Sequence, residues 1–227
     1  MQTPAYTRQN EITIVTISAQ IKQIESKVIN MADNFANAGV YLIQTFFGLY
    51  TMALMLRFLM QVSRVDYYNP ISQGIVKITD PAIKPFRSVI PNVRGIDFAT
   101  IATAFAVQLI AVMLILMLWG APFFSPIYLA WVMLGLFSIV FKIYFFALIV
   151  LVISSWIAPQ SSHPALNLVH QITEPICIPA KKLLPPMGGM DFSIILVFVF
   201  INVIDNILVI APLAKTLGVP GNLIFGL

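Results

Sequence analysis

The hydrophobic positions of this chain fall into four long apolar runs, which are separated by shorter and more polar segments. The runs cover residues 39–62, 98–119, 133–157 and 192–211. Each run is close to the roughly 20 residues that an α-helix needs to cross about 30 Å of hydrocarbon. Residues 127–132 are interpreted as an interfacial lead into the third helix, which would be too long for a bilayer if it were straight. The pattern therefore predicts an all-α membrane protein with about four transmembrane helices.

The segment before the first run carries a different pattern. Apolar residues recur there at alternating steps of three and four, which places them on one stripe of a helix, with Lys22, Glu25 and Lys27 off the stripe. The stripe consists of Ile14, Ile17, Ile21, Ile24, Val28, Met31, Phe35 and Ala38. We expect an N-terminal amphipathic helix within residues 1–38. It either lies in the headgroup interface, which is the favoured interpretation, or forms a seam for a partner helix or a second copy.

The composition agrees with a membrane protein. Hydrophobic residues make up 59% of the chain and charged residues 10%, against about 45–50% and about 25% in soluble domains. An ordinary water-soluble globule is therefore excluded. The lone Cys177 excludes an intramolecular disulfide, and we expect it at a plain apolar position. We expect no cleavable signal peptide, because residues 1–16 lack a basic start followed by an uninterrupted apolar stretch.

One pattern occurs twice in the chain, each time between two apolar runs. Residues 69–98 and 163–192 align without a gap, and nine of these thirty positions are identical. One acidic and one basic position also keep their charge, which indicates an internal duplication. We therefore divide the chain into four parts. They are the N-terminal extension, a first repeat over residues 39–119, a connection over 120–132 and a second repeat over 133–227.

The loop inside each repeat is expected to begin with a short amphipathic helix on the membrane surface. Pro70 and Pro164 suit the first turn of a helix, because the missing N–H would be unsatisfied there anyway, and Asn69 can cap it. We expect Pro81 and Pro175 to end these helices, since the residue before a proline is pushed out of the α region. A second short basic segment is expected after each of these prolines.

Each loop ends in Gly-X-Asp-Phe, immediately before the next apolar run. The glycine permits a turn, and Asp97 or Asp191 can cap the transmembrane helix that follows. Arg57 lies about 9 Å from the loop end of the first span. It either snorkels to the surface or anchors the loop by pairing with a carboxylate, Asp97 first and Asp66 second.

Most of the positive charge lies in the two repeat loops. Their basic residues are Arg64, Lys77, Lys84, Arg87, Arg94, Lys181 and Lys182. Because positively charged loops stay in the cytoplasm, we place both loops on the cytoplasmic face and both termini outside. Membrane lipids, especially anionic ones, are the expected partners. We expect headgroup contacts at Lys77, Lys84, Arg87, Lys181 and Lys182.

Several polar residues fall at membrane depth. Counted from the predicted helix ends, Lys142 and Asp205 both lie roughly 20 Å from the cytoplasmic side, so we predict a buried ion pair between them. Asn202 and Asn206 share the predicted face of Asp205 and can satisfy its remaining lone pairs, with Gln108 at a similar level on the second span. The alternative is that Lys142 snorkels and Asp205 is protonated or faces a partner subunit.

No motif of an enzyme is present. The chain has no glycine-rich phosphate loop, no HExxH and no paired cysteine, and its two histidines, His163 and His170, lie two helical turns apart. We therefore expect no catalytic residue, no cofactor and no metal site, and we predict no nucleic-acid contact. A ligand pair formed by His170 and Glu174 is far less expected than a solvated ion pair on a helix.

The chain resembles the YggT family of bacterial inner-membrane proteins, also called YlmG. The resemblance rests on Asp66-Tyr67-Tyr68-Asn69-Pro70, Thr79-Asp80-Pro81, Pro85-Phe86-Arg87, Gly95-Ile96-Asp97 and the second copy that ends at Phe192. It implies a two-repeat membrane protein of a Gram-negative bacterium. Members have been linked to osmotic or ion homeostasis, to cell division and, in plastids, to cytochrome maturation and nucleoid arrangement. The second copy departs from the first at two positions. Leu151 stands where the first copy has Arg57, and His163 stands where the first copy has Asn69.

Two hypotheses of function follow. The first is a non-enzymatic organising or assembly protein, whose basic loops bind anionic lipid and dock other membrane proteins or a second copy. The second is passage of an ion or small solute through the bundle, which the polar residues at membrane depth suggest. The first is favoured, because hydrogen bonding between helices is a sufficient reason for polar residues inside a bundle.

Overall fold

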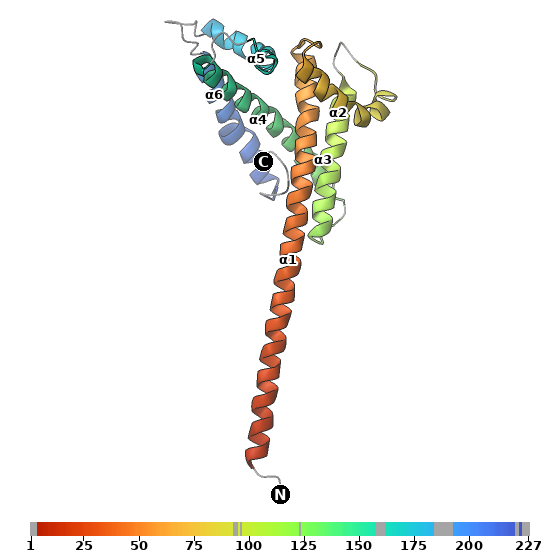
Figure 1. Cartoon of the computed structure of the whole chain (residues 1–227), viewed down its shortest axis with the longest axis vertical. Helices are drawn as coiled ribbons and strands as arrows, with labels where there is room; N and C mark the ends of the chain where they lie inside the picture. The colour runs from red at the N-terminus through yellow and green to blue at the C-terminus, as the bar shows by residue number, and fades with distance from the viewer. Residues whose placement is uncertain are drawn as a thin grey trace. The chain divides into compact units, whose positions relative to one another are not determined.

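The computed structural model describes residues 4–92, 95, 97–122, 124–157, 162–183, 193–220 and 223; of residues 4–21, 32 and 208 it describes the backbone alone. Within these ranges the regular elements are all helical (Figure 1). They are α1 (Pro4–Val62), α2 (Pro70–Arg87), α3 (Phe98–Leu118), α4 (Ile127–Ile157), α5 (Pro164–Leu183), α6 (Ser193–Asn202), the π-helix η1 (Val203–Leu208) and α7 (Ile210–Thr216).

Four of the described helical stretches are long and apolar enough to cross a membrane, which confirms the predicted fold class. They are Lys22–Val62 within α1, then α3, α4, and Ser193–Thr216, which combines α6, η1 and α7. The sequence pattern suggests one regular α-helix for the last stretch. The structure differs, because the π-helix η1 interrupts this stretch. Residues 127–132 belong to α4 without a break.

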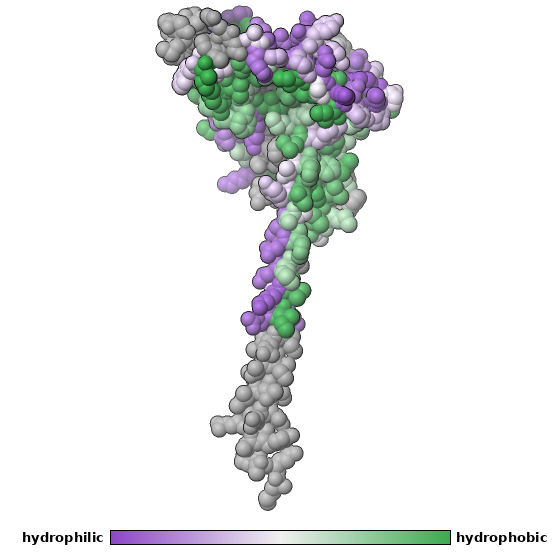
Figure 2. All heavy atoms as spheres, in the orientation of Figure 1, coloured by the Kyte–Doolittle hydropathy of each residue, from purple (hydrophilic) through white to green (hydrophobic). Residues whose placement is uncertain are grey.

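The chain forms two compact units, residues 1–42 and residues 43–227, and each is described by itself. In the first unit, the segment predicted as an amphipathic helix belongs to α1. Its apolar residues Ile24, Val28, Met31 and Phe35 are all more than half exposed. Figure 2 shows polar and apolar side chains on opposite sides of this segment. Whether the stripe meets lipid, a partner helix or a second copy stays a prediction.

The second unit has a core that joins the two repeats. Its main cluster contains Leu54 from α1, Ile83 from α2, Ala104 from α3, Ile139 from α4 and Ile172 from α5. These side chains are almost fully buried against one another. The five helices therefore pack around one centre. The loop helices α2 and α5 are therefore part of the folded unit.

A second cluster holds α4, α5 and α6 together. It consists of Leu148, Cys177, Ala180, Val197 and Ile201. Cys177 is 4% exposed and lies among apolar side chains, as the sequence suggested.

The loop helices are longer than predicted, and this corrects the expectation that Pro81 and Pro175 end them. α2 continues to Arg87 and α5 to Leu183, and each contains, beyond its first residue, two internal prolines four residues apart. A proline removes one backbone hydrogen bond to the residue four positions earlier. All four prolines are exposed, so the carbonyls that they release lie on the outer face of each helix, where solvent or headgroups can bind them.

The predicted helix starts are confirmed by the caps. Asn69 is the N-cap of α2, where its side-chain oxygen accepts from the N–H of Ile71 at 2.9 Å. Asp97 caps α3 in the same way through the N–H of Ala99 at 3.1 Å. The preceding Gly95 has φ of +83°, a left-handed conformation that the absence of a Cβ makes accessible. The loop therefore turns at Gly95 and delivers Asp97 to the start of a span.

Candidate functional site: the loop face

The two loop helices contact each other, and Figure 1 shows both of them at the same end of the second unit. We call the surface formed by α2 and α5 the loop face. Asn69 donates from Nδ2 to the carbonyl of Pro164 at 2.7 Å, and Gln171 accepts from the N–H of Asp66 through Oε1 at 2.9 Å. A third bond between the repeats runs from Ser63 Oγ to the carbonyl of Ile172 at 3.2 Å. The repeats thus present their loops as one surface.

Lysine side chains cover this surface. Lys77 and Lys84 on α2 and Lys181 and Lys182 on α5 are all exposed. Figure 2 shows hydrophilic side chains gathered over the end that carries α2 and α5, with apolar side chains below them. These four lysines lie where the sequence predicted contact with headgroups, and the contact itself stays a prediction.

Below the loop face, α2 is tied to the first span by a buried arginine. Arg57 donates from Nη2 to Asp80 Oδ1 at 2.7 Å, and from Nη1 to Thr79 Oγ1 at 2.8 Å and to the carbonyl of Val76 at 3.1 Å. The side chain of Arg57 is 5% exposed and that of Asp80 is 33% exposed. A charged hydrogen bond of this length in a nearly dry setting is among the stronger kinds.

This arrangement corrects the predicted partners of Arg57. Arg57 was expected to pair with Asp97 or Asp66, and it pairs with Asp80 instead. The reason is that α2 continues through Pro81, which keeps Asp80 in the helix on the side facing α1. Asp66 has a local role, since its Oδ1 accepts from the N–H of Tyr68 at 2.9 Å.

Arg87 connects the end of α2 to the start of α3. Its guanidinium forms an ion pair with Asp97 and lies 3.8 Å from Asp80. Asp97 is nearly fully buried. Burial is the largest influence on the pKa of Asp97 and would raise it, but the hydrogen bond and charge of Arg87, helped by neighbouring side-chain hydrogen bonds, outweigh burial and hold that pKa below its usual range.

These contacts form one chain of alternating charge: Arg57, Asp80, Arg87 and Asp97. The sequence analysis did not foresee these partners of Arg87, and the headgroup contact expected of Arg87 stays a prediction. The side chain of Arg87 is 38% exposed, although its guanidinium has both carboxylates as neighbours. Asp191, the predicted equivalent of Asp97, lies outside the described residues.

The second repeat has no equivalent of this buried arginine. Leu151 stands at the position of Arg57 and is 4% exposed. Glu174, at the position of Asp80, is exposed. In this repeat α5 is packed by the apolar cluster around Cys177. The duplicated units therefore hold their loop helices by different physical means.

The predicted ion pair between Lys142 and Asp205 is not formed. Among the described residues, the pairs of opposite charge within 4.0 Å are those that link Arg57, Asp80, Arg87 and Asp97. Asp205 lies in η1, and an i→i+5 turn changes the register that an ideal α-helix would give it. The two asparagines bond to each other, from Asn206 Nδ2 to Asn202 Oδ1 at 3.3 Å.

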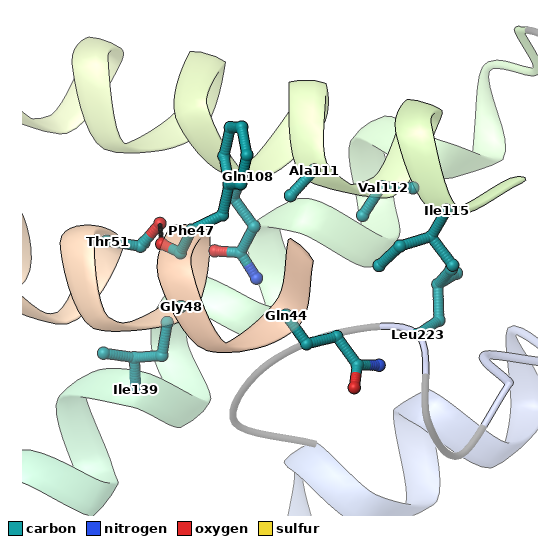
Figure 3. Close-up of a pocket in the computed structure, with 10 residues that line it drawn as sticks. All are labelled: Gln44, Phe47, Gly48, Thr51, Gln108, Ala111, Val112, Ile115, Ile139 and Leu223. Carbon is teal, nitrogen blue, oxygen red and sulfur yellow. Dashed lines mark hydrogen bonds between the residues drawn. The ribbon is translucent and has the colours of Figure 1, made fainter. Parts of the chain in front are cut away.

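Gln108 lies deep in the bundle beside a small cavity. It is 4% exposed, and neither side-chain polar atom has a hydrogen-bond partner among the described residues. Figure 3 shows it reaching from α3 toward α1, with Gln44 and Thr51 on the facing helix. The cavity measures about 10 Å³, which is about the space for one water molecule. A bound water is the simplest group that satisfies an amide there.

Comparison with known proteins places these features in a family. The profile of the CCB3/YggT family matches the chain twice, over residues 36–118 and 130–212. An uncharacterised protein of Pseudomonas aeruginosa is 44% identical over 188 residues, which cover 82% of this chain and 95% of that protein. YggT of Escherichia coli strain K12, also uncharacterised, is 35% identical over 83% of this chain and 95% of its own length. No solved structure matches the chain significantly.

Proposed function

The chain belongs to the CCB3/YggT family, and from this premise we propose that it is a non-enzymatic organising protein of the bacterial inner membrane. Its loop face lies in the cytoplasm and binds anionic lipid together with partner membrane proteins. The relatives are bacterial and carry no enzymatic name. Four apolar helical stretches supply the membrane anchorage.

The observation that carries the proposal is the joining of α2 and α5 into one face. The bonds from Asn69 to Pro164 and from Asp66 to Gln171 cross between the repeats. Basic side chains that are far apart in the sequence therefore act on the same patch of membrane or on the same partner. Near an anionic surface each lysine contributes about 1 kcal/mol, so four of them give a strong preference for that surface.

The ion-pair chain supports the same function by making the face rigid. Arg57 fixes the middle of α2 to the first span, and Arg87 fixes its end to Asp97. A docking surface that is already ordered loses less conformational entropy when a partner binds. This is a reason to bury an arginine at the loop end of a span, where an apolar residue would cost less to desolvate.

The second hypothesis, passage of a solute, gains no support from the cavity beside Gln108. The space beside Gln108 is about 10 Å³, which holds about one water and no hydrated ion. The organising role is therefore the function that we propose.

Crosslinking in intact membranes followed by mass spectrometry tests the proposal. We expect a reproducible set of membrane-protein partners for the natural chain. A variant with Lys77, Lys84, Lys181 and Lys182 all changed to Gln should lose most of this set, because the face loses its charge while its core stays intact. The matched control changes Lys22, Lys27 and Lys215, which lie outside the loop face, to Gln as well. This control should keep the set of crosslinked partners. No reproducible partner, or equal loss in both variants, would overturn the proposal.

A further inference from the structure

A groove opens between α4, α5 and α6 in the second repeat. Its volume is about 430 Å³, and its walls include Phe141, Tyr144, Ile176, Ala180 and Phe200. This volume lies within the range of about 300–1,000 Å³ that is typical of ligand sites. The walls are almost wholly apolar, so the groove suits a hydrocarbon chain.

A comparison of the two repeats explains why the groove is present in the second repeat. Ala180 stands in the second repeat where Phe86 stands in the first, within the matched segments Pro179-Ala180-Lys181 and Pro85-Phe86-Arg87. In the first repeat the Phe86 ring packs against the main core. In the second repeat the position holds a methyl group, which is buried at 4% exposure. The exchange of a ring for a methyl group leaves space beside α5.

Two lysines lie on α5 near the part of the helix that lines this space. Pro179, Ala180 and Leu183 line the groove. Lys181 and Lys182 stand between Ala180 and Leu183 in the sequence and do not line the groove themselves, so a lysine has to reach around α5 with its flexible stem to meet a head group there. Both lysines are exposed at the C-terminal end of α5. An apolar groove whose lining residues on α5 have two exposed lysines as sequence neighbours suits an amphiphile that has an acyl chain and an anionic head.

We propose that the groove between α4, α5 and α6 binds one anionic phospholipid, with an acyl chain along the apolar walls and the phosphate at Lys181 and Lys182. A phospholipid is favoured over a partner helix, because two walls of the groove belong to membrane-spanning stretches that lipid surrounds at high concentration. The inference deepens the proposed function, since it makes α5 the element that selects the lipid. The inference depends on the proposed function in one respect, which is that the loop face lies at an anionic leaflet of the membrane.

Native mass spectrometry of the full chain, released from nanodiscs that contain equal amounts of phosphatidylglycerol and phosphatidylcholine, tests the site. We expect one phosphatidylglycerol to stay bound to most chains. Ala180→Phe inserts the side chain that the first repeat has at this position and should lower the bound fraction about tenfold or more, since it fills the acyl site. Ile178→Phe is the matched control, because Ile178 is on the same helix, is 47% exposed and does not line the groove.

A second variant tests the charge without changing the core. Lys181→Gln with Lys182→Gln should reduce the preference for phosphatidylglycerol about thirtyfold, which corresponds to about 1 kcal/mol for each lysine. The same exchange at Lys22 and Lys27, which are exposed and lie outside the loop face, should leave the retained lipid unchanged. Should Ala180→Phe fail to fold, Leu196→Trp fills the groove from the α6 side and serves in its place.

The outcomes separate the site from the proposed function. Equal retention of both lipids by the natural chain, equal retention by Ala180→Phe and Ile178→Phe, or a partner helix found in the groove would overturn the lipid site. Each of these results leaves the crosslinking of partners to the loop face unaffected. Conversely, a retained phosphatidylglycerol in a chain without reproducible partners would keep the site and overturn the organising role.

Discussion

Arg57 and Asp80 form an ion pair of 2.7 Å that joins the first membrane-spanning helix to the middle of the loop helix α2. The two partners are buried to different extents, because the side chain of Arg57 is 5% exposed and that of Asp80 is 33% exposed. The arginine therefore depends on the carboxylate more than the carboxylate depends on the arginine.

Unequal burial leads to unequal effects of mutation. Asp80→Ala leaves a nearly dry guanidinium without its carboxylate and should cost about 3–5 kcal/mol of stability. Arg57→Leu leaves a partly exposed carboxylate beside Arg87 and should cost less. The double variant should be more stable than Asp80→Ala alone. Unfolding in SDS followed by circular dichroism measures all three.

The second repeat supplies the control for this cycle. Glu174→Ala changes the equivalent acid, which is exposed and faces no buried cation, because Leu151 stands at the arginine position. It should change stability by less than about 0.5 kcal/mol. If the double variant were as unstable as the sum of the single variants, Arg57 and Asp80 would not be coupled as the structure indicates.

Asn69 combines two roles that can be separated. Its Oδ1 caps α2, and its Nδ2 binds the carbonyl of Pro164. Asn69→Asp keeps an acceptor for the cap but loses the donor, so it should release α5 while the first turn of α2 stays protected. Asn69→Ala loses both and should also weaken the start of α2 by about 1 kcal/mol. Hydrogen–deuterium exchange of both helix starts distinguishes the two variants. Identical exchange patterns would refute the division of roles.

The pair of Arg87 and Asp97 should make stability depend on acid. The pKa of Asp97 is lower in the folded chain than its ordinary value of about 3.9. Its contribution to stability is therefore complete above about pH 4 and is lost as the pH falls through the folded pKa. Asn at position 97 can still cap α3 but does not titrate. Unfolding of the natural chain and of Asp97→Asn, compared between pH 3 and pH 7, should show a steeper loss below pH 4 in the natural chain; equal slopes would contradict the pairing.

The orientation of the loop face can be measured with single cysteines in a Cys177→Ser background. Lys84→Cys and Lys182→Cys should react with a membrane-impermeant maleimide only after the inner membrane is opened, because positive loops stay in the cytoplasm. Lys215→Cys, on α7, should react from the outside. The Cys177→Ser chain alone is the blank. Labelling of position 182 in cells with a closed inner membrane would reverse the proposed topology.

The spans and the caps could be predicted from the sequence, because each depends on local rules. Long apolar runs require burial in lipid, Asn69 and Asp97 precede helix starts, and Gly95 stands where φ is positive. The helix through Pro81 and Pro85 could not be predicted in this way. Packing of Ile83 into the core outweighs the local preference of the residue before a proline, and the exposed prolines lose their hydrogen bonds on the outer face.

The errors at the candidate site follow from that difference. Once α2 continues, Asp80 faces α1 and becomes the partner of Arg57 in place of Asp97. The pairing of Lys142 with Asp205 was derived from ideal α-helical depth, which the π-helix at Val203–Leu208 does not keep. The groove had a signal in the sequence, the exchange of Phe86 for Ala180 between matched copies, but its meaning required the positions of α4 and α6.

The most direct test of the organising role is a photo-crosslinking amino acid placed, in separate strains, at position 77 on α2 and at position 182 on α5. Because α2 and α5 form one face, both positions should capture the same membrane-protein partner, while the same probe at position 215 should not. Different partners at the two positions, or capture equal to that at position 215, would contradict the claim that the two repeats build a single docking surface.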